Sequence, residues 1–164
     1  MHIVTPAEVE LEVPTVEQGR WNDQKTVAPA AQQNQLDDEA KDHFIQRNGV
    51  EFAGTHLLLD LWGASHLDEI DRIEQAMRDI VAACGATLLH IHLHHFTPSG
   101  GVSGVAVLAE SHISVHTWPE RDYAAFDVFM CGDAEPENAV PVLKRAFFPH
   151  RIEVCEELRG RVVE

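Results

Sequence analysis

The chain has 164 residues, of which 45% are hydrophobic and 24% charged, a composition that suits one globular domain able to fold without a disulfide or a metal. Its formal net charge of -15 argues against nucleic acid or an anionic membrane as a partner, because an acidic surface repels both. No apolar run approaches the roughly 20 residues that cross a bilayer, and Glu8, Glu10 and Glu12 stand where a signal peptide is apolar. We therefore expect a cytoplasmic protein.

The N-terminal part differs in composition from the rest. Gln, Asn, Pro, Ala and acidic residues dominate residues 1–50, and no period of two or 3.6 is sustained there. We predict a flexible polar N-terminal extension over 1–50 and one domain over 51–164. The apolar residues Phe44, Ile45 and Val50 make the end of the extension a candidate to dock on the domain.

A strand and a helix follow in chain order. Thr55–Trp62 is predicted to form a mostly buried strand. After it, apolar residues recur three or four positions apart, which predicts an amphipathic helix. Its apolar positions are Leu67, Ile70, Ile73, Met77, Ile80 and Cys84. Ser65 and Asp68 form a candidate capping box at its start, and Gly85 is suited to end it.

Four strands, a second helix and a last strand complete the pattern. The strands are expected in two hairpins, Thr87–Phe96 with Val102–Glu110 and His112–Trp118 with Tyr123–Cys131. The helix, over about Pro136–Phe148, begins late or bends, because Pro141 lacks a backbone donor. His150–Glu157 is the last strand. This order predicts an α+β fold, a two-layer sandwich of mostly antiparallel sheet with two helices on one face.

Reactive side chains gather in two segments, residues 101–120 and 123–132. These segments hold hydroxyls, imidazoles, carboxylates and a thiol, on Ser103, Ser111, Ser114, His112, His116, Glu110, Glu120 and Cys131. A serine near a histidine is compatible with a hydrolase, but no G-x-S-x-G elbow presents a nucleophile. From the residues alone, a nucleophile with a nearby base is one open interpretation.

The run from Glu110 to Glu120, Glu-Ser-His-Ile-Ser-Val-His-Thr-Trp-Pro-Glu, resembles the self-cleavage signature of the prokaryotic S-adenosylmethionine decarboxylases. Gly-Val-Ser-Gly lies at the family's distance before it and Cys-Gly at the family's distance after it. The resemblance extends from about Gly54 to the C-terminus. It implies a proenzyme that cuts itself at Glu110–Ser111 into a β chain, 1–110, and a pyruvoyl-capped α chain, 111–164.

The resemblance also implies how the cut is made. Ser111 Oγ would attack the carbonyl of Glu110 to give an ester, and β-elimination followed by hydrolysis would leave a pyruvoyl group at the new N-terminus. The position of His116 is the family's base in this processing, a task that suits an imidazole with an unperturbed pKa of about 6.5. The position of Ser103 assists the ester step.

As a family member, the processed protein would be a carboxy-lyase that converts S-adenosylmethionine to CO2 and the aminopropyl donor for spermidine biosynthesis. The covalent pyruvoyl cofactor would form a Schiff base with the substrate amine, as pyridoxal phosphate does elsewhere. Cys131 would protonate the decarboxylated carbon, and Glu120 would bind the ribose hydroxyls. Phe96 would stack on adenine, and Ile113 is also assigned to substrate binding. The family implies a homodimer of processed αβ units, and we assign no metal ligands among the site residues.

Simpler roles compete with these assignments. Ser103 is alternatively a turn hydroxyl, His116 a strand histidine, Cys131 a core thiol and Phe96 a core aromatic, while Trp118 is expected to pack. Within an unbroken strand, residues five apart face opposite sides, which would separate the serine and the histidine of the signature. We therefore expect the cleavage site at a bend or turn, a geometry that also strains the scissile peptide.

Other functions also remain open. Relatives that share the cleavage motif decarboxylate L-ornithine or L-arginine, although Glu120 and Phe96 favour a nucleoside substrate. An unprocessed regulatory paralogue is less attractive, because the processing residues are intact. The run His90-Ile-His-Leu-His-His95 projects alternate imidazoles from one face of a strand and is a candidate metal site, although surface imidazoles are the expectation.

Overall fold

A small hairpin precedes the sheet in the computed structural model, which describes residues 44–162. Strands β1 (Ile45–Arg47) and β2 (Val50–Phe52) pair antiparallel. Phe52 is fully buried, and Arg47 forms ion pairs with Glu137 (3.5 Å) and Glu156. The hairpin therefore contacts the domain and continues across the predicted boundary at residue 50. The rest of the predicted extension, residues 1–43, lies outside the described residues.

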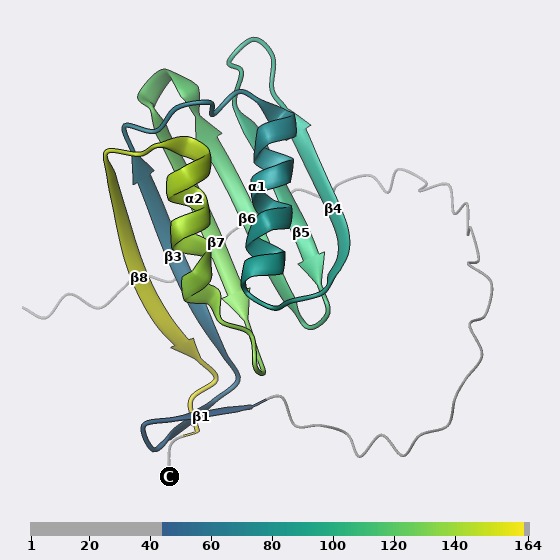
Figure 1. The fold of residues 1–164 in the computed structure, drawn as a ribbon, viewed down its shortest axis with the longest axis vertical. Coiled ribbons are helices and arrows are strands. Elements are labelled where there is room, and N and C mark those ends of the chain that lie inside the picture. Colours follow the sequence, from purple (N-terminus) through teal and green to yellow (C-terminus); the bar gives the residue numbers. More distant parts are fainter. Residues whose placement is uncertain (1–43, 163–164) are drawn as a thin grey trace, which may run out of the picture. The chain divides into compact units, whose positions relative to one another are not determined.

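The domain is a six-stranded antiparallel sheet covered on one face by two helices (Figure 1). The strand order is β4-β5-β6-β7-β3-β8. The strands are β3 (Gly54–Trp62), β4 (Leu88–His95), β5 (Val102–Leu108), β6 (Ser111–Trp118), β7 (Tyr123–Met130) and β8 (Arg151–Arg159), and the helices are α1 (Ile70–Ala83) and α2 (Ala139–Phe147). This arrangement confirms the predicted two-layer α+β sandwich.

The core lies between the sheet and the helices. Leu57, Leu59 and Leu61 of β3 point toward the helices and are at most 2% exposed, while Ile73 and Met77 of α1 are fully buried against the sheet. Each such side chain contributes about 1.5–3 kcal/mol to folding by leaving water. Strict alternation along the strands then sends every second side chain to the opposite face.

We call this opposite face the open face. On its β4–β5–β6 half lie His90, His92, His94, Ser103, Val105, Val107, His112, Ser114, His116 and Trp118. On its β7–β3–β8 half lie Tyr123, Ala125, Asp127, Phe129, His56, Leu58, Asp60, Trp62, Arg151, Glu153, Cys155, Glu157 and Arg159. Several of its large apolar side chains are exposed, including Leu58 (38%), Trp62 (38%) and Val107 (41%). These side chains make the open face a candidate interaction surface.

Helix α1 begins later than the sequence predicts. Its first residue is Ile70, and its N-cap position is Glu69, which makes no side-chain capping bond. The predicted capping box is wrong because Ser65 is engaged elsewhere: its Oγ donates to the Phe147 carbonyl at 3.2 Å, and so does its backbone N–H at 2.8 Å. At the other end Gly85 has a φ of 74°, which confirms that glycine follows the helix in the left-handed conformation.

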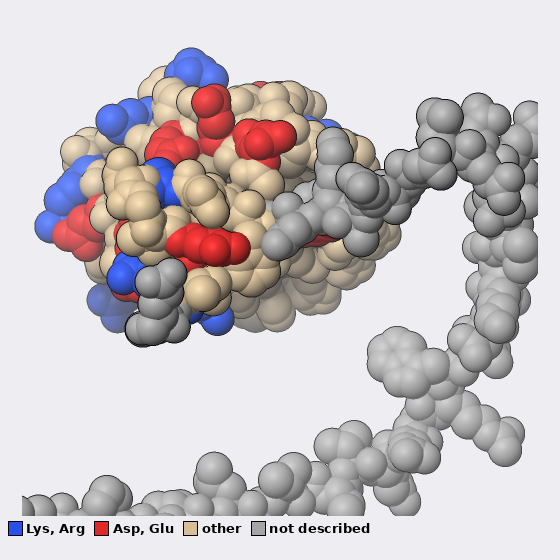
Figure 2. Space-filling view, turned by 90° about the horizontal axis from the view of Figure 1, so that it is seen from below, with Lys and Arg blue, Asp and Glu red and all other residues tan. Residues whose placement is uncertain are grey.

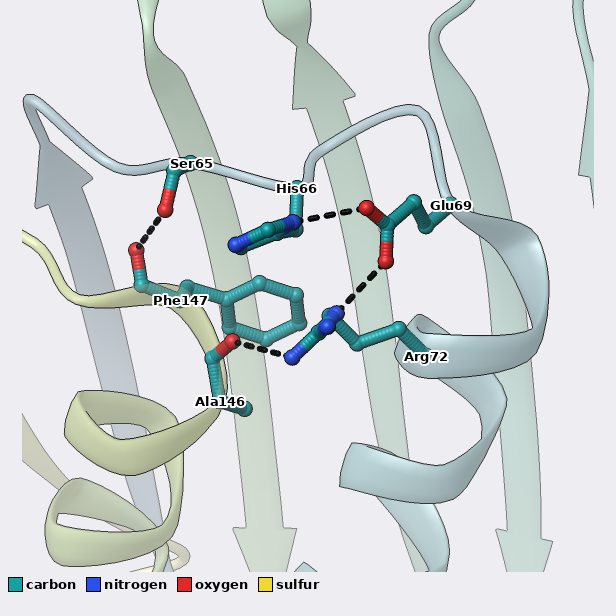
Figure 3. A network of polar contacts seen from close by, with 6 residues as sticks. All are labelled: Ser65, His66, Glu69, Arg72, Ala146 and Phe147. Atoms are coloured by element: carbon teal, nitrogen blue, oxygen red, sulfur yellow. Dashed lines mark hydrogen bonds and ion pairs between the residues drawn. The ribbon is translucent and has the colours of Figure 1, made fainter.

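A polar network joins the start of α1 to the end of α2 (Figure 3). The Glu69 carboxylate lies 2.6 Å from both His66 Nδ1 and Arg72 Nε, and the hydrogen bond from Arg72 lowers its pKa. Arg72 also reaches the Ala146 carbonyl at 3.5 Å, near the C-terminus of α2. The network sets the two helices beside each other on the sheet.

The sequence left open whether the second helix begins late or bends at Pro141, and the structure confirms the late start. A 3-10 turn at Pro136–Asn138 leads into α2, so Pro141 falls in the first helical turn, where a missing backbone N–H costs no internal bond. Neither of the described helices is long and apolar enough to cross a bilayer.

Thr117 offers a test of how the loop before α1 is held. Its buried hydroxyl donates to the Leu67 carbonyl (2.7 Å) and accepts the Val102 N–H (2.8 Å). Replacing it in Thr117→Val leaves both backbone groups without this partner, so the free energy of unfolding should fall by about 1–3 kcal/mol in urea denaturation. The exposed Thr87→Val is the matched control and should change it by less than about 0.5 kcal/mol. Equal effects would show that the bridge is not stabilising.

Candidate active site

The Glu110–Ser111 peptide lies at a tight turn, as the sequence predicts. Strands β5 and β6 form a hairpin in which Leu108 pairs with Ser111, so only Ala109 and Glu110 connect them. Glu110 has a φ of 67°, in the left-handed region that disfavours a side chain. Such a residue stores about 1–3 kcal/mol of strain, which the surrounding structure must hold. The strain falls on the residue whose carbonyl would be attacked.

Cys131 touches both sides of this peptide. Its thiol donates to the Glu110 carbonyl at 2.8 Å and lies 3.6 Å from Ser111 Oγ, while its backbone N–H donates to the same Oγ at 3.3 Å. The thiol thus polarises the carbonyl, and the N–H orients the hydroxyl. Cys131 is half-buried, in contrast to Cys84, which is 2% exposed and whose pKa burial raises to about 11.

A cavity of about 320 Å³ opens beside this peptide. We call it the cleavage pocket; it is lined by Gly85, Ala86, Thr87, Ala109, Glu110, Ser111, Cys131, Gly132, Asp133 and Ala134. Figure 2 views the domain from the end that carries the β5–β6 turn, where acidic and basic side chains lie close to one another. Because Glu110 and Ser111 both line the cleavage pocket, their peptide is accessible to a small molecule.

A second cluster lies at the opposite end of the same hairpin. Ser103 pairs with His116 across β5 and β6, and their side chains meet at 2.8 Å between Oγ and Nδ1. The Trp118 ring stacks on the His116 imidazole, with centroids 6.0 Å apart. These groups border a cavity of about 280 Å³. We call it the aromatic pocket; it is lined by Phe96, Ser99, Gly101, Ser103, His116, Thr117, Trp118 and Glu120.

One chain does not bring the two clusters together. Strand β6 is continuous, and the five residues from Ser111 to His116 span roughly 16 Å. Ser111 lies at the end of the strand, next to the turn, whereas His116 projects from the open face. The structure thus joins Ser111 to Cys131 and Ser103 to His116, Phe96 and Glu120, but keeps the two groups apart.

The structure places one assigned residue, Ile113, away from both pockets and places Trp118, expected only to pack, in one of them. Ile113 is fully buried on the helix side of β6, because it alternates with the open-face residues His112 and Ser114, so its side chain lines neither pocket. Trp118, expected to pack, is 40% exposed and forms a wall of the aromatic pocket. The period of two along β6 would have found it, because Trp118 shares the face of His116.

Histidines are concentrated on the open face. His56 Nδ1 accepts a hydrogen bond from Arg159 (3.3 Å), and burial lowers the pKa of its imidazole, although Asp127 at 3.8 Å opposes this. Strand β4 exposes His90, His92 and His94 on the same face. Within residues 44–162 of one chain, no group of three or more His, Cys, Asp or Glu could hold a metal ion.

The family profile described as S-adenosylmethionine decarboxylase matches residues 55–160, which include both pockets. The chain belongs to this family. The resemblance drawn from Glu110–Glu120 and its flanking blocks is thereby confirmed, and so is the class of enzyme, a decarboxylase.

Individual relatives agree with the profile. An S-adenosylmethionine decarboxylase proenzyme of Thermomicrobium roseum is 48% identical over 112 residues, which cover 68% of this chain and 97% of the relative. A proenzyme of the same name from Methanococcus maripaludis strain C7 is 48% identical over 110 residues, covering 65% of this chain and 89% of the relative. The crystal structure of the adenosylmethionine decarboxylase from Aquifex aeolicus matches with a TM-score of 0.60 and 34% identity, covering 69% of this chain and 94% of that one.

Proposed function

We propose that this chain cleaves itself between Glu110 and Ser111 and, once processed, decarboxylates S-adenosylmethionine. The observation that carries the first step is the set of contacts that Cys131 makes with this peptide. A strained turn, a polarised carbonyl and an oriented hydroxyl are what an intramolecular acyl shift requires. The substrate is inferred from the names of the relatives and from the pairing of aromatic rings with Glu120 in the aromatic pocket.

Self-cleavage proceeds by an acyl shift followed by elimination. Ser111 Oγ attacks the Glu110 carbonyl carbon, and the negative charge that develops on the oxygen is met by the Cys131 thiol. The C–N bond breaks to leave an ester and a free amine at residue 111. Loss of the α-proton expels the Glu110 carboxylate, and hydrolysis of the resulting enamine releases ammonia and leaves a ketone. His116 is the base that we assign to the proton transfers.

The residues around Ser111 fit a pyruvoyl group. It would be held in the cleavage pocket beside Cys131, where it supplies a ketone carbon that binds an α-amine and accepts electrons as CO2 leaves. The Cys131 thiol is placed to deliver a proton. In the aromatic pocket, Phe96 and Trp118 offer faces for a purine and Glu120 offers a carboxylate for ribose hydroxyls.

The separation of the two pockets points to a homodimer. A two-fold axis that runs across the strands turns the open face of one copy onto that of another with the strands reversed. The Ser111 end of β6 in each copy then lies opposite the His116 end in the other copy, so each end of the dimer holds both groups of one composite site. An axis parallel to the strands would bring like ends together and complete neither site. Exposed Leu58, Trp62 and Val107 supply apolar surface for the contact.

Ser111→Ala tests the cut and the substrate together. The wild-type chain should give two fragments by intact-mass analysis, at residues 1–110 and 111–164, and release CO2 from S-adenosylmethionine. Ser111→Ala lacks the attacking oxygen and should remain one chain with no activity above background. Ser114→Ala, on the same strand and hydrogen-bonded to Asp127 (2.6 Å), is the control and should be processed. A clean cut in Ser111→Ala would refute the mechanism, and CO2 release from L-ornithine or L-arginine instead would refute the substrate.

Cys131→Ala should impair both reactions. Losing the donor to the Glu110 carbonyl should slow processing by about 100–1,000-fold, the usual cost of one such donor. In the fraction that is processed, kcat should fall by about 100–10,000-fold while KM changes little, because the thiol acts on the proton transfer and not on binding. The rates follow from time-resolved gels and CO2 assays. Cys155→Ala, at an exposed thiol, is the control, and equal behaviour of the two variants would exclude this role.

Mixed dimers test the composite site. Ser111→Ala and His116→Ala should each be inactive alone. When the two are co-expressed, half of the dimers are mixed, and each mixed dimer holds one site with both groups intact. We therefore expect roughly a quarter of the wild-type activity, together with partial cleavage of the His116→Ala chain. If each chain carried a complete site, co-expression would restore nothing.

A further inference from the structure

Three imidazoles on β4 have no part in the proposed reaction. His90, His92 and His94 alternate along the strand on the open face, and all three are exposed. Along the ladder with β5, His90, His92 and His94 pair in turn with Val107, Val105 and Ser103. His95 breaks the alternation and pairs with the buried Val102, which faces the helices. The sequence therefore places a row of potential metal ligands on one face of the strand.

One copy of the row is not a complete site. Alternate residues of a strand are about 6.6–6.8 Å apart, so two neighbouring imidazoles can converge on one ion but a third cannot. The absence of any group of three potential ligands within residues 44–162 of one chain agrees with this limit. Structural zinc sites in proteins need four ligands. The missing ligands must come from another chain.

The register of the sheet locates the second copy's histidines. The argument rests on the dimer proposed above, in which Ser111 lies opposite His116 of the other copy. The midpoint of these residues on β6 is at Ile113 and Ser114. These two pair with Ala106 and Val105, which in turn pair with Ile91 and His92 of β4. The two-fold axis therefore crosses β4 between Ile91 and His92, and His90 and His92 lie closest to it.

We propose that His90 and His92 of the two copies bind one zinc-like transition-metal ion on this axis. The four imidazoles are related in pairs by symmetry, which matches tetrahedral coordination. Facing sheets pack about 10 Å apart, so an ion midway is about 5 Å from each strand. An imidazole with a metal–nitrogen bond of about 2.0–2.1 Å covers that distance. The lone pairs of four neutral rings make the bonds, and no electron is transferred.

The ion would clamp the dimer and take no part in decarboxylation. The β4 histidines lie one and two strands away from Ser103 and His116, and none of them lines either pocket. A metal that binds only the dimer stabilises it by mass action. Through the dimer it would hold the two pockets of each composite site together.

Zinc binding to the full-length, processed protein tests the proposal. Chelator-treated protein should take up one Zn2+ for every two processed αβ units in a titration, and Co2+ should give the intense visible absorption of a tetrahedral site. In the double variant His90→Gln/His92→Gln the affinity for Zn2+ should fall by more than about 100-fold. Replacing a residue that only hydrogen-bonds to a metal ligand typically lowers metal affinity by about 10–100-fold, and here the ligands themselves are lost. His95→Gln, on the same strand but the opposite face, is the matched control and should bind as the wild type does.

Sedimentation and activity separate this proposal from the proposed function. The double variant should still cleave itself and release CO2, but its dimers should dissociate at higher concentration than wild-type dimers with Zn2+. If the wild-type dimer is active, and Ser111→Ala and His116→Ala complement each other, but the wild-type protein binds no Zn2+, then the metal site alone is overturned. Binding that persists in the double variant, or that reaches one ion per monomer, also overturns it. A monomer that is nevertheless active would overturn the dimer and the metal site together.

Discussion

The antiparallel pairing of β5 with β6 is the constraint on which the site depends. One ladder sets Leu108 opposite Ser111 and Ser103 opposite His116, so the turn that strains Glu110 and the hydrogen bond that joins Ser103 to His116 have the same origin. A shift of this register by one residue would move every side chain of β6 to the other face. The turn at Glu110 and the hydrogen bond between Ser103 and His116 would then both be lost.

The same ladder is the reason for the dimer that we propose. A straight strand cannot return on itself, and Ser111 and His116 of β6 stay roughly 16 Å apart. In the proposed dimer, a two-fold axis across the strands makes each end of the β5–β6 hairpin the neighbour of the opposite end of the same hairpin in the other copy. The exposed aromatic ladder of Trp118, Tyr123 and Trp62, with centroids 5.3 and 4.4 Å apart, belongs to the face that this contact would cover.

The two halves of the open face differ in their polar side chains. Most of its imidazoles lie on the β4–β5–β6 half, whereas its carboxylates lie on the other half together with His56, Arg151 and Arg159, and there Tyr123 donates to Asp60 at 2.5 Å. Burial and this carboxylate raise the pKa of the Tyr123 phenol to about 12, so it stays a donor at neutral pH. An axis across the strands brings like halves together, imidazole to imidazole. A cation shared between the facing rings makes that contact favourable.

The sequence by itself determined the elements of the fold, the family and the residues to which we assign the chemistry. Hydrophobic periods of two and 3.6 predicted the sheet and both helices, and alternation along β6 required a turn at Glu110–Ser111. The alternation of side chains along β6 also indicated that Trp118 shares the face of His116. The family resemblance of the cleavage signature, drawn from residue type and spacing, was confirmed by the relatives.

Only the tertiary structure decided which of these residues meet. Ser65 was expected to cap α1 but bonds to Phe147, because the loop is held by a residue 82 positions away. Ile113 was assigned to substrate but lies in the core, and Cys131 reaches the Glu110 carbonyl from the end of another strand. Local propensity acts over a few residues, whereas these contacts depend on strand order and register. Those are set by how the whole sheet buries one face against the helices.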